Sequence, residues 1–327
     1  MTKGMRTFVV ALCVSLATSS TVYVQAAWKP QKSVEIIVGT SPGGGQDRSA
    51  RAIHRLIQEK NLLEVAATVV NKPGSGSALG YAYLNQHPND AHYIMLSTTP
   101  LITNPITGLQ KITYEDLTPL TLLFDEYIVT TVAAGSPIKT GKELLARLKA
   151  DPASLSIGIP GVGGGGHLGF ALAAKAAGVD VKKLKTVVFK SGGDSMSALL
   201  GGHIDVMTST TGAPLSQHRA GKVRILAVGS RERIPGDMAS VPTWRELGVN
   251  VEFANWRGMV GPRELTAAQI AFWENVLAAV AATPEFKKDV EKNSWVSNFA
   301  KSAEMRQRLK AQHDELKALL TELGMAK

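Results

Sequence analysis

The chain has very little cysteine: Cys13 is the single copy in 327 residues. It lies in an apolar run near the start, so a chain that loses this segment contains no cysteine. Disulfides, thiol catalysis and cysteine metal sites are then excluded. Leu12 stands before Cys13, where a lipoprotein signal requires a small residue, so we expect no lipid anchor.

Signatures of catalysis are also missing. The sequence holds no H-E-x-x-H or similar metal spacing and no G-x-S-x-G elbow, and its seven histidines are scattered. No G-x-x-x-x-G-K-[ST] loop for a nucleoside triphosphate occurs. We therefore expect no metal, no cofactor and no catalytic residue.

One stretch does fit the dinucleotide pattern G-x-G-x-x-G, at Gly161, Gly163 and Gly166, and Asp180 follows about 20 residues on. The pattern needs that acid at the end of the next strand, where it would contact a ribose. Lys190 stands at that place instead. The dinucleotide interpretation is therefore the disfavoured alternative to anion binding by this loop.

The charge is neither strong nor clustered. The formal net charge is +9, and no block of five like charges occurs. A nucleic-acid partner is therefore not expected, although a mild positive field helps to gather small anions. The apolar run at residues 7–17 is shorter than the roughly 20 residues that a spanning helix needs.

The first residues have the pattern of a secretory signal peptide. Lys3 and Arg6 precede the apolar run, and Val24 and Ala26 supply the small pair that a signal peptidase reads. An N-terminal membrane anchor is the alternative, which the short run disfavours. We expect residues 1–26 to be removed and the mature protein to be soluble and periplasmic, with enough chain for about two domains.

Apolar, β-rich runs alternate with helical patterns in the first half of the mature chain, which indicates a parallel sheet covered on both faces. The following run is predicted as two extended segments with a turn near Asp125. The predicted elements are strands at 33–38, 64–70 and 92–98, helices at 47–60 and 77–86, and the extended segments within 117–135.

A second series of strands and helices follows, and the chain after Pro262 is predicted to be nearly all helical. Thr140 and Thr283 are the expected helix caps, and Gly178 the expected helix end. Two such series with a helical tail predict two α/β lobes. The second series comprises helices at 139–150, 167–178 and 194–202 and extended runs at 154–160, 185–190, 203–210, 223–229 and 251–261.

Three glycine-rich loops stand near strand ends and open helices, at 41–47, 71–77 and 158–169. Open α/β sheets bind ligands at the carboxyl ends of their strands, so the three loops can line one cleft. Backbone N–H groups at helix starts hold anions. We expect Gly44 to approach the anion with a positive φ. The alternative is that these glycines only make tight turns.

Two polar residues accompany the loops. His167 follows the third loop at a helix start, where a neutral ring could donate or accept a hydrogen bond; loop packing is the alternative. Asp47 follows the first loop, and its candidate roles are a base, a helix cap or a group that fixes an ordered water.

The motifs in their order resemble one known family. They are "PGGGQD", "VVNKPGSGSALG" (69–80), "GIPGVGGGGHL", "VVFKSGGDSMSALLGGHIDV" (187–206) and "NWRGMVGP" (255–262). Together with the signal peptide and the helical end, they are similar to the Bug-type extracytoplasmic solute receptors of tripartite tricarboxylate transporters. The resemblance spans the whole chain.

The resemblance implies an α/β fold of the type II periplasmic-binding-protein class, a Venus flytrap whose hinge the chain crosses twice. Domain 1 would comprise residues 28–131 plus 254–327, and domain 2 residues 132–253. A small organic carboxylate would be held in the cleft between them, partly through ordered waters. The partners would be that ligand and the permease subunits of the transporter, and we expect a monomer.

The loops, strand ends and motifs together give the predicted ligand-binding set. Arg257 is its most specific member, because a guanidinium can hold a second carboxylate bidentately; a structural ion pair near the hinge is the alternative. The set is Ser41, Gly43, Gly44, Gly45, Asp47, Ser75, Gly76, Thr98, Gly161, Gly163, Gly164, Gly165, His167, Lys190, Gly192, Gly193, Thr210 and Arg257.

Three functions remain open from the sequence. The leading one is a periplasmic receptor that captures a di- or tricarboxylate or an aromatic acid and delivers it to a permease. An exported hydrolase or transferase on the same scaffold is the rival, and a sensory receptor for a signalling partner is the third.

Overall fold

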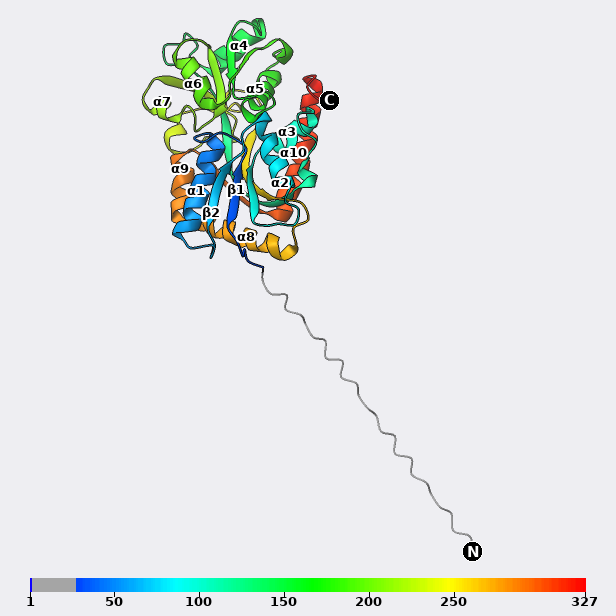
Figure 1. The fold of residues 1–327 in the computed structure, drawn as a ribbon. Helices are drawn as coiled ribbons and strands as arrows, with labels where there is room; N and C mark the ends of the chain where they lie inside the picture. The colour runs from blue at the N-terminus through cyan, green and yellow to red at the C-terminus, as the bar shows by residue number, and fades with distance from the viewer. Residues whose placement is uncertain (2–27) are drawn as a thin grey trace.

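The computed structural model describes Met1 and residues 28–327, shown as a coloured ribbon in Figure 1. The proposed signal peptide, with Cys13 and the cleavage pair at Val24 and Ala26, falls outside the described residues. Within residues 28–327, no helix is long and apolar enough to cross a membrane.

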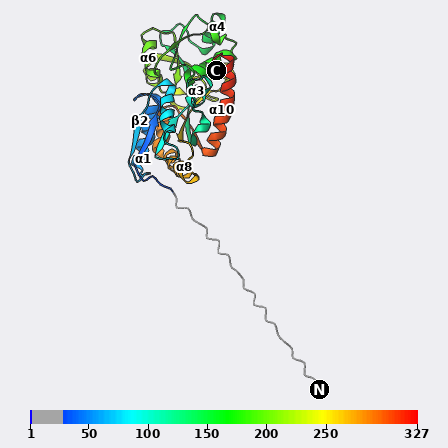
Figure 2. The same cartoon turned by 45° about the vertical axis from the view of Figure 1, so that its right-hand side comes forward.

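The molecule has two lobes, and the first contains the N-terminal part of the described chain (Figures 1 and 2). Three parallel strands in the order β2-β1-β3 follow the β-branched runs of the sequence. Helices α1, α2 and α3 alternate with them. Their bounds are β1 (Val34–Val38), α1 (Gly45–Glu59), β2 (Ala67–Asn71), α2 (Ala78–Asn85), β3 (Tyr93–Ser97) and α3 (Pro100–Ile106).

The strand β4 (Thr118–Ala133) joins the two lobes. Its first part pairs antiparallel with β9 (Ala254–Gly261) and β10 (Val296–Lys301), and its last part pairs with strands of the second lobe. The expected turn near Asp125 was wrong, since the strand continues through this residue. The sheet is also mixed rather than parallel, because β9, β4 and β10 run antiparallel to their neighbours.

The second lobe repeats the alternation of strands and helices. Its sheet has β5 between β6 and β7, while β8 pairs with β4. The bounds are α4 (Gly141–Ala150), β5 (Ser156–Ile159), α5 (Gly165–Ala176), β6 (Lys185–Val188), α6 (Gly192–Leu200), β7 (Val206–Thr210), α7 (Leu215–Arg219) and β8 (Val223–Val228).

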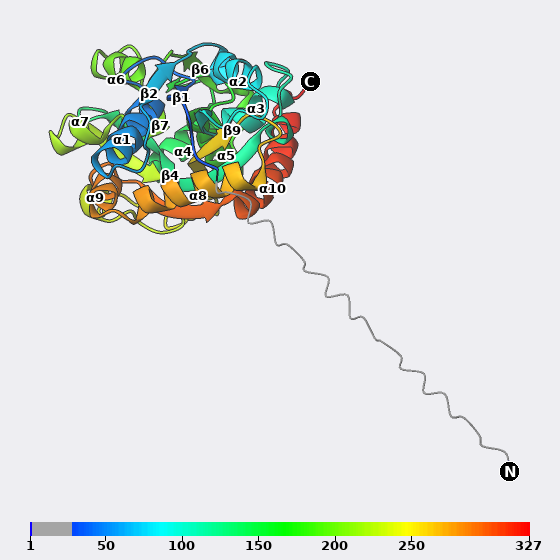
Figure 3. The ribbon, with the colours of Figure 1, turned by 60° about the horizontal axis from the view of Figure 1, so that its bottom comes forward.

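The C-terminal segment returns to the first lobe. Trp273 of α8 (Ala267–Ala282) and Phe286 of α9 (Pro284–Lys292) share one buried core with Ile36 and Ile53. On the other side, α10 (Ser302–Glu322) packs against β4 and α3. The helix α8 crosses the end of the first lobe that lies away from the second lobe (Figure 3). The strand β10 was not expected in this segment.

Candidate functional site

Two adjoining hollows lie where the lobes meet. The first, of about 200 Å³, is bordered by Gly44 of the first lobe and Gly164 of the second, with Arg257 among its lining residues. We call it the Arg257 hollow. The second, of about 480 Å³, is bordered by Ser75 and Phe189, and we call it the Ser75 hollow. Both are lined by residues of the glycine loops, so these loops share one cleft.

The first glycine loop is held from behind by Asp47. The Asp47 carboxylate, 2% exposed, accepts hydrogen bonds from the Gly43 backbone N–H at 2.8 Å, from Arg51 Nε at 2.9 Å and from Asn71 Nδ2 at 2.9 Å. Burial raises the pKa of this carboxyl, but these three bonds outweigh burial and leave the pKa below its usual value. Asp47 therefore positions the loop, and its negative charge is compensated by these three hydrogen bonds.

The loop geometry corrects the expectation for Gly44. Its φ is −67°, in the extended region, and the residue that takes the positive φ of 78° is Gly43. A Cβ on Gly44 would lie 3.1 Å from Thr40 Oγ1 and 3.2 Å from the Ser41 carbonyl oxygen. Gly44 is thus required for space beside the cleft, while Gly43 is required for conformation.

The third loop repeats the first. Gly163 takes a φ of 71°, and Gly164 is the extended residue before α5, with a φ of −78°. The backbone N–H of Gly163 donates to His167 Nδ1 at 3.1 Å, as that of Gly43 donates to Asp47. Burial lowers the pKa of His167, which keeps the ring neutral and able to accept this bond.

Helix starts from both lobes line the Arg257 hollow. The helices α1 and α5 begin there, and the glycine before each offers no side-chain cap. The first N–H groups of a helix have no partner within the helix, and the dipole makes them a positive end. Among the described residues that line the two hollows, none is acidic, and Lys190 borders both. The described lining of the cleft therefore offers positive charge and backbone donors and no acidic side chain.

The second glycine loop forms part of the lining of the Ser75 hollow. Ser75 and Ser77 take positive φ values of 46° and 76°, which non-glycine residues rarely adopt. Asn104 Nδ2 donates to the Gly76 carbonyl at 2.8 Å and holds the loop against α3. A Cβ on Gly39 would lie 2.3 Å from that of Ser77, so the residue directly after β1 must be glycine for the loop to pack there.

Arg257 is buried at the floor of the cleft. It is 4% exposed, and its Nη2 donates to Glu126 Oε2 at 2.5 Å. Glu126, 2% exposed, also accepts a long 3.4 Å bond from the Gly212 N–H of the second lobe. Arg257 Nε has no hydrogen-bond partner. The guanidinium is thus both a member of an ion pair and part of the lining.

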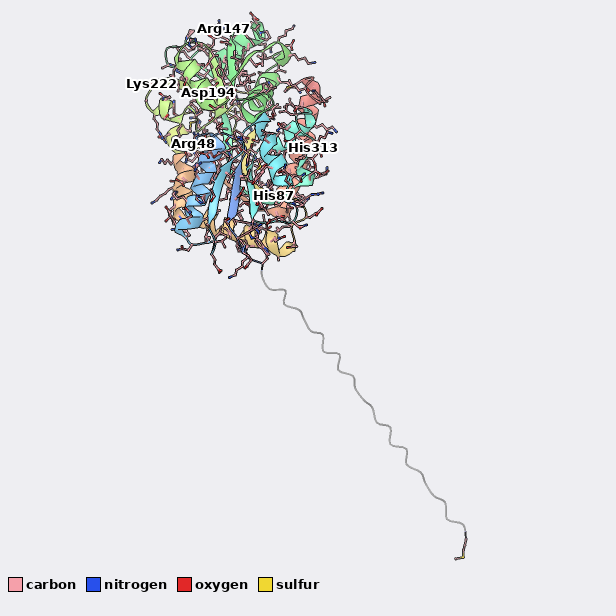
Figure 4. The ribbon with its side chains drawn as sticks, in the orientation of Figure 1. Arg48, His87, Arg147, Asp194, Lys222 and His313 are labelled. Carbon is pink, nitrogen blue, oxygen red and sulfur yellow. The ribbon has the colours of Figure 1, made fainter. Side chains whose placement is uncertain are left out.

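The remaining charged side chains near the cleft support its walls. Arg48 lies at the level where the two lobes meet (Figure 4), and its Nη1 donates to the Gly43 carbonyl at 2.9 Å. On α6, Ser191 accepts a bond from the Asp194 N–H, so this helix start is capped, unlike those of α1 and α5.

The structure brings most of the predicted residues to the two hollows, and their binding of a ligand stays a prediction. Those that line a hollow are Ser41, Gly44, Gly45, Ser75, Gly76, Thr98, Gly161, Gly164, Gly165, Lys190, Gly192, Thr210 and Arg257. Gly43, Asp47, Gly163, His167 and Gly193 do not line either hollow.

The sequence analysis missed two buried amides in the lining. Gln46 lines both hollows, and Asn255 lines the Arg257 hollow, where its Oδ1 accepts a bond from Thr99 Oγ1 at 3.0 Å. Both stand inside motifs that were quoted, directly after Gly45 and two residues before Arg257. Their polar character within otherwise glycine-rich or apolar runs was the available signal.

Comparison with known proteins identifies the family. The family model "TctC: Tripartite tricarboxylate transporter family receptor" matches residues 53–325. The chain belongs to this family. A relative in Cupriavidus necator, the UPF0065 protein in the gbd 5′ region, is 27% identical over 307 residues, which are 93% of this chain and 91% of the relative. The TctC family consists of periplasmic solute-binding receptors, which are not a class of enzymes.

Solved structures agree on the fold. A TctC solute-binding protein from Polaromonas is 27% identical with a TM-score of 0.71, covering 90% of this chain and 99% of its own. The periplasmic binding protein BugD is 25% identical with a TM-score of 0.81, covering 91% and 99%. A Rhodopseudomonas palustris protein solved with adipate is 21% identical with a TM-score of 0.82, covering 91% of this chain and 99% of its own. A second protein from that organism, solved with malate, is 21% identical with a TM-score of 0.72, covering 90% and 97%. The expected resemblance and α/β solute-binding fold are thus confirmed.

Proposed function

We propose that this chain is a receptor that captures a small organic carboxylate in the cleft between its lobes. The observation that carries the proposal is the pair of uncapped helix starts, α1 and α5, which face one hollow lined by no acidic residue. Two positive helix ends that face each other repel, so an anion between them stabilises the arrangement. The glycine loops leave room for a carboxylate to reach the N–H groups.

The size of the cleft and its cations extend the proposal to acids with more than one carboxylate. Lys190 supplies positive charge beyond the helix ends, and Arg257, although paired with Glu126, adds guanidinium donors to the lining. The Ser75 hollow gives space for the rest of the ligand. The neighbours solved with adipate and malate hold dicarboxylates on this fold. We propose a di- or tricarboxylate as the first choice of ligand, with aromatic acids as the alternative.

We propose binding without chemistry. The described residues that line the two hollows include no histidine, cysteine, aspartate or glutamate, so no imidazole, thiolate or carboxylate base lines them. A ligand recovered unchanged after incubation with the protein would agree with this proposal, and a converted ligand would contradict it.

The two lobes are proposed to act as hinged domains, 28–131 plus 254–327 and 132–253. The strand β4 crosses from the first lobe to the second, and the chain returns to the first lobe where β9 begins; closure around a ligand would occur at these two crossings. We propose that the closed monomer is recognised by the permease of a tripartite tricarboxylate-type transporter. Export through a cleaved signal peptide at 1–26 belongs to the same proposal.

A thermal-shift screen tests the proposal. A carboxylate at 100 times its Kd adds about 2.7 kcal/mol to the free energy of unfolding, which raises Tm by about 5 °C. Gly44→Val places a β-branched side chain against Thr40 and Ser41 and is expected to abolish this shift while the protein stays folded. Gly135→Val is the matched control, since Gly135 has no atom within 4 Å of its added Cβ.

The two variants separate the outcomes. A parent-like ligand shift in Gly44→Val would show that the carboxylate is not held at this loop. The absence of a shift with every organic acid of a broad panel, in a protein that gives a cooperative melt, would overturn the proposed receptor function.

A further inference from the structure

One buried side chain in the cleft has a polar atom that nothing satisfies. Gln46, the second residue of α1, is 7% exposed and lines both the Arg257 hollow and the Ser75 hollow. Its Nε2 makes two long hydrogen bonds of 3.4 Å, to Ser77 Oγ and Thr98 Oγ1. Its Oε1 is buried and has no hydrogen-bond partner.

A buried acceptor without a donor is costly, by about 1–3 kcal/mol. In the described part of the chain, the neighbours of Gln46 hold the amide through Nε2 and leave Oε1 without a donor, while the residue lines both hollows. A ligand that extends from one hollow to the other passes this side chain. A hydrogen-bond donor on the ligand would satisfy Oε1 there.

The place of Gln46 fixes where that donor belongs. Gln46 follows Gly45 in the first turn of α1, so its amide lies beside the N–H groups that are proposed to hold the carboxylate. The donor therefore sits on a carbon close to that carboxylate. This step rests on the proposed function, because it takes the carboxylate at the start of α1 as given.

The charge of the cleft decides between the two common donors, a hydroxyl and an ammonium. An ammonium beside Gln46 would face Lys190, Arg257 and two helix starts, with no acidic residue among the described lining residues to pair with it. A hydroxyl carries no charge and donates one proton. It suits a single unmet acceptor.

We propose that Gln46 selects a hydroxycarboxylate, an acid that carries a hydroxyl group next to or near the carboxylate bound at α1. The receptor then discriminates against the acid without the hydroxyl and against the amino acid of the same skeleton. Gln46 is a specificity-determining residue, whereas the loops and helix starts supply the affinity common to all carboxylates.

Three acids with one carbon skeleton test this proposal: malate, succinate and aspartate. Calorimetry on the parent is expected to show malate binding about tenfold tighter than succinate, the effect of one hydrogen bond, and aspartate weaker than malate. Gln46→Met, which keeps the length of the side chain and removes the amide, should bring the malate-to-succinate ratio close to one with succinate affinity retained. Glutarate and 2-hydroxyglutarate form a second pair for a cleft that prefers a longer acid.

The control is Gln58→Met, an exposed glutamine on the same helix, which should keep the ratio of the parent. Gln46→Ala repeats the test with the smallest demand on packing if Gln46→Met does not fold. A ratio that is unchanged in the Gln46 variants, or no preference for the hydroxy acid in the parent, overturns the inference while carboxylate binding stands. If no carboxylate binds the parent at all, the proposed function fails and the inference fails with it.

Discussion

Replacing Arg257 by leucine is the most informative single change in the cleft. The guanidinium is 4% exposed, and its removal leaves Glu126, 2% exposed, as a buried carboxylate. The 2.5 Å bond to Arg257 Nη2 is then lost, and the 3.4 Å bond from Gly212 is too long to compensate. Breaking one partner of a buried pair costs about 3–5 kcal/mol, so we expect the free energy of unfolding of Arg257→Leu to fall by that amount.

A double-mutant cycle isolates the pair. Glu126→Gln combined with Arg257→Leu removes both charges, and the double variant is expected to regain most of the stability that Arg257→Leu loses. Urea denaturation at pH 7 gives the four free energies. Losses that simply add would mean that the two side chains do not depend on each other, and the ion-pair reasoning would be refuted.

The same variants test whether Arg257 also binds a carboxylate of the ligand. Its Nε has no partner and the residue lines the hollow, so a second carboxylate is expected to bind there. Succinate and butyrate have four carbons each and differ in that carboxylate. Arg257→Leu should bind succinate about a hundredfold more weakly, as loss of about 2.7 kcal/mol implies, and butyrate almost as the parent does.

Two further variants sharpen this prediction. Arg257→Lys should also bind succinate poorly, because a point charge does not reproduce the planar fork. Glu126→Gln frees the guanidinium and should keep succinate binding. Equal losses for succinate and butyrate would show that Arg257 only holds the hinge, which is the alternative weighed from the sequence.

Two predictions concern other parts of the molecule. Burial raises the pKa of Asp125 to about 6, against the lowering effects of Asn298 and Arg308. The folded state therefore holds this proton more tightly than the unfolded state, so the free energy of unfolding falls as the pH rises from about 4 to 7. That fall amounts to at most about 3 kcal/mol. The variant Asp125→Asn should remove the fall, and it should be more stable than the parent at pH 7 but not at pH 4. Urea denaturation that shows the same difference in stability at both pH values would contradict this. The exported protein should begin after Ala26, and an intact mass that still includes Cys13 would contradict cleavage there.

Local chemistry made much of the fold predictable. The β-branched runs at β1 and β3 became buried parallel strands within about one residue of the expected bounds. Thr140 caps α4 by accepting a bond from the Glu143 N–H, and Thr283 caps α9 in the same way, as expected. These features depend on residues close in the sequence, where the spacing of caps and apolar positions is informative.

The errors arise where distant residues decide the local structure. Asp125 and Glu126 interrupt an apolar run and suggested a turn, yet β4 continues through them. Asn298 donates to Asp125 at 2.5 Å and Arg257 neutralises Glu126, so both carboxylates are accommodated inside a strand. No window of the sequence contains these partners, which lie more than a hundred residues away.

The candidate site was predictable only in part, for a different reason. The glycine loops could be found from the sequence because glycine and helix starts are local features. The roles of Asp47 and His167 could not, because each accepts the backbone N–H of a glycine whose positive φ, at Gly43 and at Gly163, was not predicted. Asp47 and His167 each occupy the third position of their helix, and each accepts the N–H of the glycine four residues earlier.

The first and third glycine loops are therefore held in the same way by different residues, Asp47 and His167. The glycine before each helix provides no side-chain cap for the first N–H groups, and an acceptor at the third helical position holds the loop. Asp47 accepts as an anion whose pKa is lowered by its partners, so it works into acidic pH. His167 accepts only as a neutral ring, which burial favours by lowering its pKa. The hydrogen bond that holds the second-lobe loop therefore depends on a neutral His167, since a protonated ring can no longer accept the Gly163 N–H.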